Sequence, residues 1–266
     1  MNTKVAILGG GNLGTALAKG LARTEEASSK YDVTITRRNA DLIRYLEDDG
    51  ITVTADNTAA VEEADLVILS VQPTQIEDLV NDIKSVLDPQ QHILISTMAG
   101  VNDEDITELT GSGFPIFRVM PNTAAAINQA MTCVERTPHK EAEKKVIELF
   151  ESLGKTLLIN TDLMEAATVL GACGIAFFLR YIRAASQGGI EVGFHAKEAQ
   201  LIASQTALGA AALLLDSDNH PEHEIDKVTT PKGCTIAGLN EMEHNGLSSA
   251  LIKGIKVSYE MIEKIR

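Results

Sequence analysis

The chain has 266 residues, of which 44% are hydrophobic and 23% charged, the balance typical of a globular protein rather than a disordered one. Its 23 Lys and Arg against 37 Asp and Glu give a net charge of −14. Such an acidic chain repels phosphate backbones and anionic lipids, which argues against nucleic acid and membrane surfaces as partners. An anionic small ligand must therefore be held by local groups that act against the overall field.

Cysteine usage and apolar runs indicate the environment of the chain. Cys133, Cys173 and Cys234 lie far apart without metal-binding spacing, as expected for reduced thiols. The longest purely apolar run late in the chain, Ala210–Leu215, is too short to span a bilayer. Glycines interrupt the amino-terminal apolar segment at once, which is unlike a signal segment. We therefore expect a cytoplasmic protein without a metal site or a membrane partner.

The first half of the chain alternates two hydrophobic periods. Short apolar runs occur at Val5–Leu8, Val33–Thr36, Leu66–Val71, Ile93–Ser96 and Ile116–Val119, and helical spacing occurs at Ala16–Leu21, Leu42–Leu46 and Ile76–Ile83. This alternation predicts βαβ units, and hence a doubly wound parallel sheet with helices on both faces.

The pattern changes after Pro121. A strand near Met131–Val134, a helix over about residues 138–152 and an extended piece at 154–160 are followed by almost wholly helical sequence. Leu163–Val192 and Ala196–Leu215 are apolar around most of their circumference, so burial against a second copy of the chain is expected. Gly188, Gly189 and Gly193 are expected to break or kink the first of these helices. We predict two domains, residues 1–160 and 161–266.

Gly9, Gly11 and Gly14 form the pattern G-x-G-x-x-G directly after the first predicted strand and at the start of a helix. In such a turn the first glycine allows the tight bend, the second lets a pyrophosphate approach the backbone, and the third allows close helix packing. A plain strand-to-helix turn would account for two of the glycines. The continuing βα pattern favours dinucleotide binding, with Asn12 and Leu13 completing the turn.

The end of the second predicted strand indicates which dinucleotide binds. A site for NAD places an acidic residue there to bind the ribose hydroxyl, but this strand continues into Arg37 and Arg38. Two guanidinium groups suit a 2′-phosphate, so we expect NADPH to bind more tightly than NADH. The alternative is a solvated turn with two surface arginines. Replacing both arginines by Ala is expected to abolish the preference.

Several longer motifs resemble the pyrroline-5-carboxylate reductase family over nearly the whole chain. They are SVQPTQI (70–76), STMAGV (96–101), FRVMPNTAAAI (117–127), LIASQTALGAAALLL (201–215) and DKVTTPKGCTIAGLNEME (226–243). The resemblance implies an amino-terminal Rossmann domain followed by an all-α dimerisation domain, and a homodimer or a higher homo-oligomer. It also implies hydride transfer from NAD(P)H to the C=N bond of 1-pyrroline-5-carboxylate, which gives L-proline.

Further site residues are expected at strand ends and in the late loop. Ligands bind at the carboxyl ends of parallel strands, so the cofactor is expected to contact Val71, Gln72, Pro73, Ala99 and Gly100, although Pro73 could simply open a helix. The resemblance alone places Pro121 and Asn122 at the substrate; otherwise they would only end a strand.

The loop before the last predicted helices is the expected substrate site. The amides and hydroxyls of Thr230, Gly233, Cys234 and Thr235 can form an anion nest. By analogy with the family, Thr235 is the catalytic candidate that contacts the ring nitrogen. The alternative is an N-cap turn between two helices in which Thr235 merely caps.

The chain departs from the family pattern at three places. It has Gly171-Ala172-Cys173-Gly174-Ile175-Ala176-Phe177 where the family commonly has Gly-Ser-Gly-Pro-Ala-Tyr, Arg183 and Gln187 where acidic residues are usual, and Lys232 where glycine is usual. These changes bear on the shape of the substrate pocket.

Two other functions compete with this interpretation. A β-hydroxyacid dehydrogenase also joins a dinucleotide-binding domain to a helical one, but it needs a lysine on the inter-domain helix, and 162–181 contains none. A non-catalytic NADP(H)-sensing protein would keep the glycine turn and would not need the Thr230–Thr235 loop.

Overall fold

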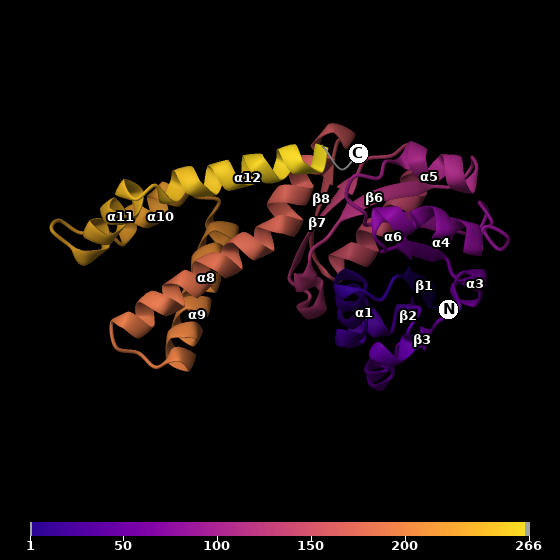
Figure 1. Ribbon diagram of the computed structural model, residues 1–266, viewed down its shortest axis with the longest axis horizontal. Coiled ribbons are helices and arrows are strands. Elements are labelled where there is room, and N and C mark those ends of the chain that lie inside the picture. The colour runs from indigo at the N-terminus through magenta and orange to yellow at the C-terminus, as the bar shows by residue number, and fades with distance from the viewer. Residues whose placement is uncertain (1, 264–266) are drawn as a thin grey trace. The chain divides into compact units, whose positions relative to one another are not determined.

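A computed structural model describes residues 2–263 of the chain, which form two compact units (Figure 1). The first unit comprises the chain up to Cys173 together with the final turn of the last helix, from Tyr259. The second comprises Gly174–Ser258 and is wholly helical apart from its loops.

An eight-stranded sheet forms the centre of the first unit, in the order β3-β2-β1-β4-β5-β6-β7-β8. The strands are β1 (Thr3–Leu8), β2 (Tyr31–Thr36), β3 (Thr52–Thr54), β4 (Leu66–Leu69), β5 (Ile93–Ser96), β6 (Ile116–Met120), β7 (Ala130–Glu135) and β8 (Gly154–Ile159). The pairings from β3 to β6 are parallel, in the order typical of dinucleotide-binding sheets. Only the β6–β7 pairing among the described strands is antiparallel. The predicted α/β fold is confirmed, with this one exception to a parallel sheet.

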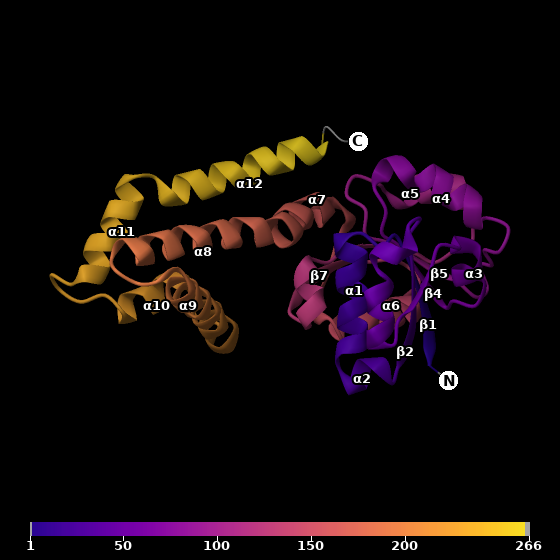
Figure 2. The same cartoon turned by 60° about the horizontal axis from the view of Figure 1, so that its bottom comes forward.

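Helices cover both faces of this sheet (Figure 2). They are α1 (Asn12–Arg23), α2 (Glu25–Ser28), α3 (Asn57–Glu62), α4 (Ile76–Ile83), α5 (Asp103–Thr110) and α6 (Lys140–Glu151). Leu17 and Leu21 of α1 and Phe150 of α6 pack with Ile7 and Phe117 on one face. α3, α4 and α5 bury their apolar side chains on the other face. Alternate residues of β1 therefore enter different cores, which is why its apolar run is continuous.

Two short segments differ from the sequence predictions. β3 was not predicted, because its three residues are partly exposed and form no continuous apolar run. The segment Leu42–Leu46, predicted as α-helical, instead contains parts of the 3₁₀ turns η1 (Ala40–Leu42) and η2 (Arg44–Asp49). Ile43 and Leu46 are buried there, so the apolar spacing reflects burial of two anchors rather than a regular α-helix.

The predicted helix Leu163–Val192 is divided. It comprises η5 (Thr161–Leu163), α7 (Met164–Ala167), a π-helical segment η6 (Thr168–Cys173) and α8 (Gly174–Glu191). Of the expected break or kink at Gly188 and Gly189, the break is wrong, since α8 runs through both residues. Gly193 does end the helical region, with a φ of 116° that favours glycine. The helical run is therefore interrupted at the π-helical segment η6, before Gly188 and Gly189 rather than at them.

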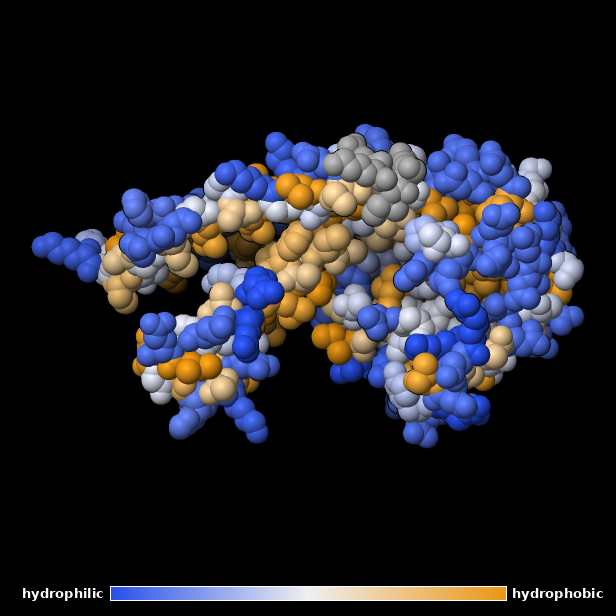
Figure 3. Space-filling view, viewed as in Figure 1, coloured by the Kyte–Doolittle hydropathy of each residue, from blue (hydrophilic) through white to orange (hydrophobic). Residues whose placement is uncertain are grey.

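The remaining helices of the second unit are α9 (Ala196–Ser217), α10 (Pro221–Lys227), α11 (Cys234–His244) and most of α12 (Leu247–Glu263). Figure 3 shows apolar side chains gathered on the surface of the long helices. Phe178 and Leu201 remain 66% and 69% exposed. By length and composition alone, Thr161–Glu191 and Ala196–Ser217 would suffice to cross a membrane, but the apolar core helices of globular proteins meet the same criterion.

His92, which directly precedes β5, is expected to make folding sensitive to pH. It is 1% exposed; its Nδ1 accepts the Asp88 N–H at 2.9 Å, which leaves Nε2–H to donate to the Val61 carbonyl at 3.1 Å. Burial lowers the pKa of this imidazole below its ordinary value of 6.5, despite the opposing carbonyl bond and the charges of Asp88 and Asp65. The folded state therefore binds fewer protons than the unfolded state as the pH falls below this value.

We expect the His92 contribution to the free energy of unfolding to decline as pH falls from 6.5 toward the lowered folded pKa. Urea unfolding at about pH 5.5 and about pH 7.5 measures this decline. His92→Gln does not titrate and should show a smaller difference between the two pH values. An unchanged pH dependence in this variant would exclude His92 as its source.

Candidate cofactor and substrate site

The glycine turn lies between β1 and α1 and has the geometry its spacing predicted. Gly9 has a φ of 118°, and a Cβ there would collide with the Ser70 carbonyl. A Cβ at Gly14 would collide with the Gly9 carbonyl, so α1 packs directly against the turn. At Gly11 an added Cβ would meet no atom within 4 Å among the described residues. The chain itself demands glycine at the first and third positions, whereas the second faces open space, where a ligand can approach.

The start of α1 is suited to an anion. Gly11 is its N-cap, and in the described part of the chain no side chain caps this end. The first turn carries no acidic residue, and Asn12 is exposed. The free N–H groups and the positive end of the helix dipole can therefore bind a phosphate. The residues present fit the pyrophosphate of a dinucleotide.

Arg37 and Arg38, which follow β2, have different environments. Arg37 is partly buried, and its Nη1 donates to the Gly10 carbonyl at 2.9 Å. Its main-chain N–H donates to the Thr54 carbonyl. Arg38 is exposed. Arg37 thus stabilises the glycine turn through its bond to Gly10, whereas the side chain of Arg38 is accessible to a ligand.

The other predicted cofactor residues lie at the same edge of the sheet, after β4 and β5. Val71, Gln72 and Pro73 follow β4, and Gln72 is the N-cap of the short turn η3 (Pro73–Gln75). Ala99 and Gly100 follow β5, with Gly100 at a φ of 78°. The Thr97 hydroxyl and N–H both donate to the Leu69 carbonyl and hold the ends of these two strands together. Ligands bind at this edge in doubly wound sheets.

Pro121 and Asn122 follow β6 and are both buried. The Asn122 Oδ1 accepts the Ala124 N–H at 3.1 Å, and its Nδ2 donates to the Gly171 carbonyl at 3.2 Å. Both polar ends of this side chain therefore have partners within the first unit.

A buried ionic cluster beside these residues was missed by sequence reasoning. Arg118 is 3% exposed and lies within 3.2 Å of a carboxylate oxygen of Glu165 and 3.8 Å of one of Glu135. Thr161 donates a short hydrogen bond to Glu135. Burial raises the pKa of Glu135, although Thr161 and Arg118 oppose the shift. The available signal in the sequence was a single arginine within the otherwise apolar strand Ile116–Met120, whereas its acidic partners could not be found without the structure.

In the second unit, the predicted substrate loop is a tight turn before α11. The Gly233 N–H donates to the Thr230 carbonyl at 2.9 Å, with Pro231 second and Lys232 third in the turn. Lys232 has a φ of 62°, so the loop has the marks of a type II turn, which favours glycine at this position. A Cβ at Gly233 would collide with Thr230. Gly233 is the N-cap of α11, and Cys234 and Thr235 form its exposed first turn, without acidic residues.

The backbone of Lys232 gives a stability prediction. A left-handed conformation costs a non-glycine residue about 1–2 kcal/mol. Glycine avoids this cost, but it loses more conformational freedom on folding, which cancels part of the gain. We therefore expect Lys232→Gly to raise the free energy of unfolding by up to about 1 kcal/mol. Urea unfolding measures the change, with Lys232→Ala as the control that removes the charge but keeps the strain. Equal stabilisation by both variants would exclude the backbone as the cause.

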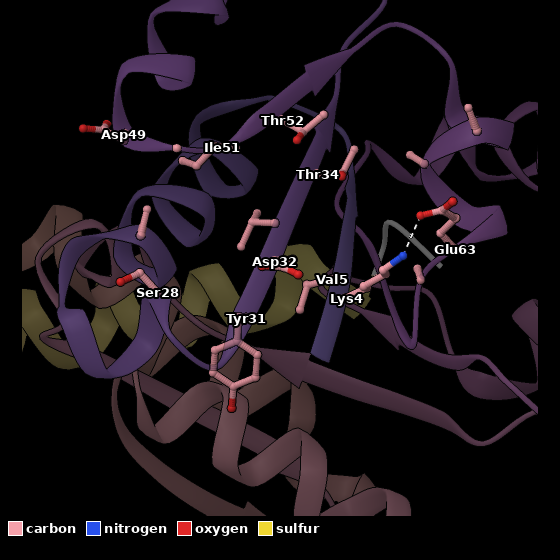
Figure 4. A pocket seen from close by; sticks show the side chains of 16 residues that line it. Lys4, Val5, Ser28, Tyr31, Asp32, Thr34, Asp49, Ile51, Thr52 and Glu63 are labelled. Carbon is pink, nitrogen blue, oxygen red and sulfur yellow. Dashed lines mark hydrogen bonds and ion pairs between the residues drawn. The ribbon is translucent and has the colours of Figure 1, made fainter. Parts of the chain in front are cut away.

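A hollow of about 520 Å³ lies elsewhere, at the amino-terminal side of the sheet (Figure 4). Lys4, Asp32 and Thr52 line it, and Lys4 already forms an ion pair with Glu63 at 2.5 Å. It is remote in the sheet from the glycine turn, because parallel strands end at the opposite edge. Among residues 2–263, no group of three or more His, Cys, Asp or Glu side chains is placed to hold a metal ion.

Two models of known protein families match this chain, one in its amino-terminal part and one in its carboxy-terminal part. Residues 4–100 match a family model described as NADP oxidoreductase, coenzyme F420-dependent. Residues 161–265 match one described as pyrroline-5-carboxylate reductase dimerisation. Together with the sheet order and the glycine turn, these matches define an NAD(P)H-dependent oxidoreductase with a helical dimerisation domain.

Individual relatives identify the family. The chain is 42% identical to pyrroline-5-carboxylate reductase 2 of Dictyostelium discoideum, over 99% of this chain and 93% of that protein. It is 47% identical to pyrroline-5-carboxylate reductase 1 of the same organism, over 96% of this chain, but spans only 48% of that protein's length. A Plasmodium falciparum pyrroline carboxylate reductase structure with NADP bound superimposes with a TM-score of 0.86 at 23% identity, covering 99% of each chain. The chain belongs to the pyrroline-5-carboxylate reductase family, as its motifs predicted.

Proposed function

We propose that the chain reduces the C=N bond of 1-pyrroline-5-carboxylate to give L-proline, the last step of proline biosynthesis, with NADPH preferred over NADH. One observation carries this proposal: this chain, a member of the family, has both the open glycine turn and the Thr230–Thr235 loop. When bound, the reduced nicotinamide supplies the hydride. The protein's own residues have to bind, orient and polarise the substrate.

The glycine turn and Arg38 are proposed to hold the cofactor. Gly9, Gly11 and Gly14 place the free N–H groups of α1 at the pyrophosphate, with Asn12 and Leu13 in the same turn. Arg38 is proposed to bind the 2′-phosphate, and Arg37 to hold the turn through Gly10. The strand-end residues Val71, Gln72, Pro73, Ala99 and Gly100 are proposed to line the rest of the cofactor site at the same edge.

The Thr230–Thr235 loop is proposed to bind the substrate. Its carboxylate would accept hydrogen bonds from the amides of Cys234 and Thr235 at the start of α11, where the helix end favours negative charge. The Gly233 N–H is already bonded to the Thr230 carbonyl, so Gly233 is proposed to shape the turn beside the substrate. The Thr235 hydroxyl is proposed as the catalytic contact to the ring nitrogen. A cyclic imine accepts hydride readily once its nitrogen is protonated, so positioning and one polar contact are the main requirements.

The matched dimerisation domain supports homo-oligomerisation, and we propose a homodimer formed through residues 161–266. Among the described residues of α9 only Ala199 is buried within the single chain, so a partner is needed to cover its apolar side chains. Light scattering at micromolar concentration should show a dimer or a multiple of it. A stable, soluble monomer would contradict the proposal.

The direct test is NADPH oxidation, followed by absorbance, with and without 1-pyrroline-5-carboxylate. Oxidation that depends on the imine and yields proline supports the proposal. Oxidation of a β-hydroxyacid with reduction of NADP+ to NADPH would instead favour a dehydrogenase of that class. NADPH binding without turnover of either substrate would favour the sensing protein. We propose a cytoplasmic location, because the three cysteines are free thiols. The assay is therefore run under reducing conditions.

A further inference from the structure

The π-helical segment η6 interrupts a long helical run close to the candidate site. A π-helical turn contains an extra residue, so its carbonyl groups lose the regular helical pairing, and such turns are frequent at functional sites. Asn122, at the end of β6, donates its amide to the Gly171 carbonyl within η6. The wide turn and the end of β6 are therefore joined by a side chain that is only 6% exposed.

A second contact holds the same segment. Glu165, in α7 just before η6, pairs with Arg118 of β6 at 3.2 Å, and both side chains are buried. Ala167 and Ala172 pack with Met120 and Met164 in a small apolar cluster that also includes Ala99. The α7–η6 segment thus lies against the ends of β5 and β6, at the edge where the cofactor residues gather.

One side of η6 remains open. Gly171, Ala172 and Cys173 are partly exposed, and a Cβ added to Gly171 would meet no described atom within 4 Å. Glycine here is not required by packing inside the chain, unlike Gly9 and Gly14. The open side leaves room for a ligand next to the end of β6.

We propose that Asn122 is a positioning residue, which holds η6 as a wall of the reaction site through the Gly171 carbonyl, rather than a residue that binds the substrate. This assignment rests on the proposed imine reduction. It replaces the expectation of a direct substrate contact, because Oδ1 and Nδ2 are both engaged inside the first unit. Arg118 and Glu165 hold the same segment from its other end.

The test compares the two asparagines that flank η4 (Thr123–Ile127). Asn122→Ser keeps a hydroxyl to cap the Ala124 N–H and loses the amide that reaches Gly171. Asn128→Gly is the matched control: it removes amide bonds to the Gly20 and Ser152 carbonyls and suits the φ of 56° at this position. Steady-state kinetics with 1-pyrroline-5-carboxylate and NADPH, together with Tm, are measured for both variants.

We expect both variants to lower Tm, and only Asn122→Ser to lower kcat, by about tenfold to a hundredfold, because displacement by about 1 Å can cost that much. The KM for NADPH should change less than about twofold, since no cofactor contact is removed. Equal kcat values for the two variants would show a purely structural role. A large rise in the KM for the imine at unchanged kcat would instead show direct substrate binding, and would overturn the assignment.

Glu165→Gln provides a second approach to the same segment if Asn122→Ser folds poorly. Its amide keeps the size of the side chain and loses the charge that pairs with Arg118. A fall in kcat at unchanged NADPH affinity is expected, and an unchanged kcat would contradict the proposed wall. An inactive parent enzyme would refute the proposed function, whereas an active parent with unaffected variants would refute only this inference.

Discussion

Thr235→Val is expected to lower kcat/KM for 1-pyrroline-5-carboxylate by about tenfold to a few hundredfold, through loss of the proposed hydrogen bond between its hydroxyl and the ring nitrogen. Thr235 lies in the exposed first turn of α11, where Val keeps the shape and removes the hydroxyl. In a chain of net charge −14, the neighbouring free amides are the local groups available to hold an anionic substrate. NADPH affinity, measured by fluorescence titration, should remain unchanged.

Thr229→Val is the matched control for this prediction. The Thr229 hydroxyl donates to the Asp226 carbonyl at 3.1 Å, so its role lies within the loop. Its loss is expected to cost about 1 kcal/mol of stability and little activity. Unchanged kcat/KM in Thr235→Val would exclude the catalytic role. Loss of NADPH affinity in the same variant would place Thr235 at the cofactor or in the fold instead.

Arg38→Ala is expected to weaken NADPH binding by about tenfold and to leave NADH binding unchanged. A hydrogen bond to a charged group contributes about 1.5–3 kcal/mol, and solvent exposure of Arg38 reduces this value. Arg37→Ala should weaken both cofactors, because it removes the bond to the Gly10 carbonyl and loosens the turn that both would share. Fluorescence titration with each cofactor separates the two arginines.

Arg44→Ala is the control for a general loss of positive charge near this turn. Arg44 is exposed and pairs with Asp41 and Glu47. Its replacement should change neither affinity. If Arg38→Ala lowers the affinity for NADH as much as for NADPH, Arg38 does not contact the 2′-phosphate. The double replacement of Arg37 and Arg38 should abolish the preference and also lower affinity overall.

Features that depend on neighbours in the sequence could be predicted without a structure. The glycine turn follows from the spacing of three glycines between a strand and a helix. The φ of Gly9 and the close contacts at Gly9 and Gly14 agree with the roles predicted for the first and third glycine, and Gly11 is open as predicted for the second. Continuous apolar runs predicted β1 and β4 because a doubly covered sheet buries both sides of each strand. The motifs around Asn122 and Thr235 predicted the family that the relatives confirm.

Features that depend on pairing across the chain required the tertiary structure. Arg118 is joined to Glu165, 47 positions later, and neither side chain's pattern in the sequence indicates the partner. The antiparallel direction of β7 depends on its return beside β6 rather than on its apolar residues. Arg37 and Arg38 are adjacent and chemically identical, yet only the folded chain turns one toward Gly10 and leaves the other exposed. Local spacing determined the glycine turn and the buried strands, whereas tertiary packing decided the roles of identical side chains, because it selected which groups lie within hydrogen-bonding distance.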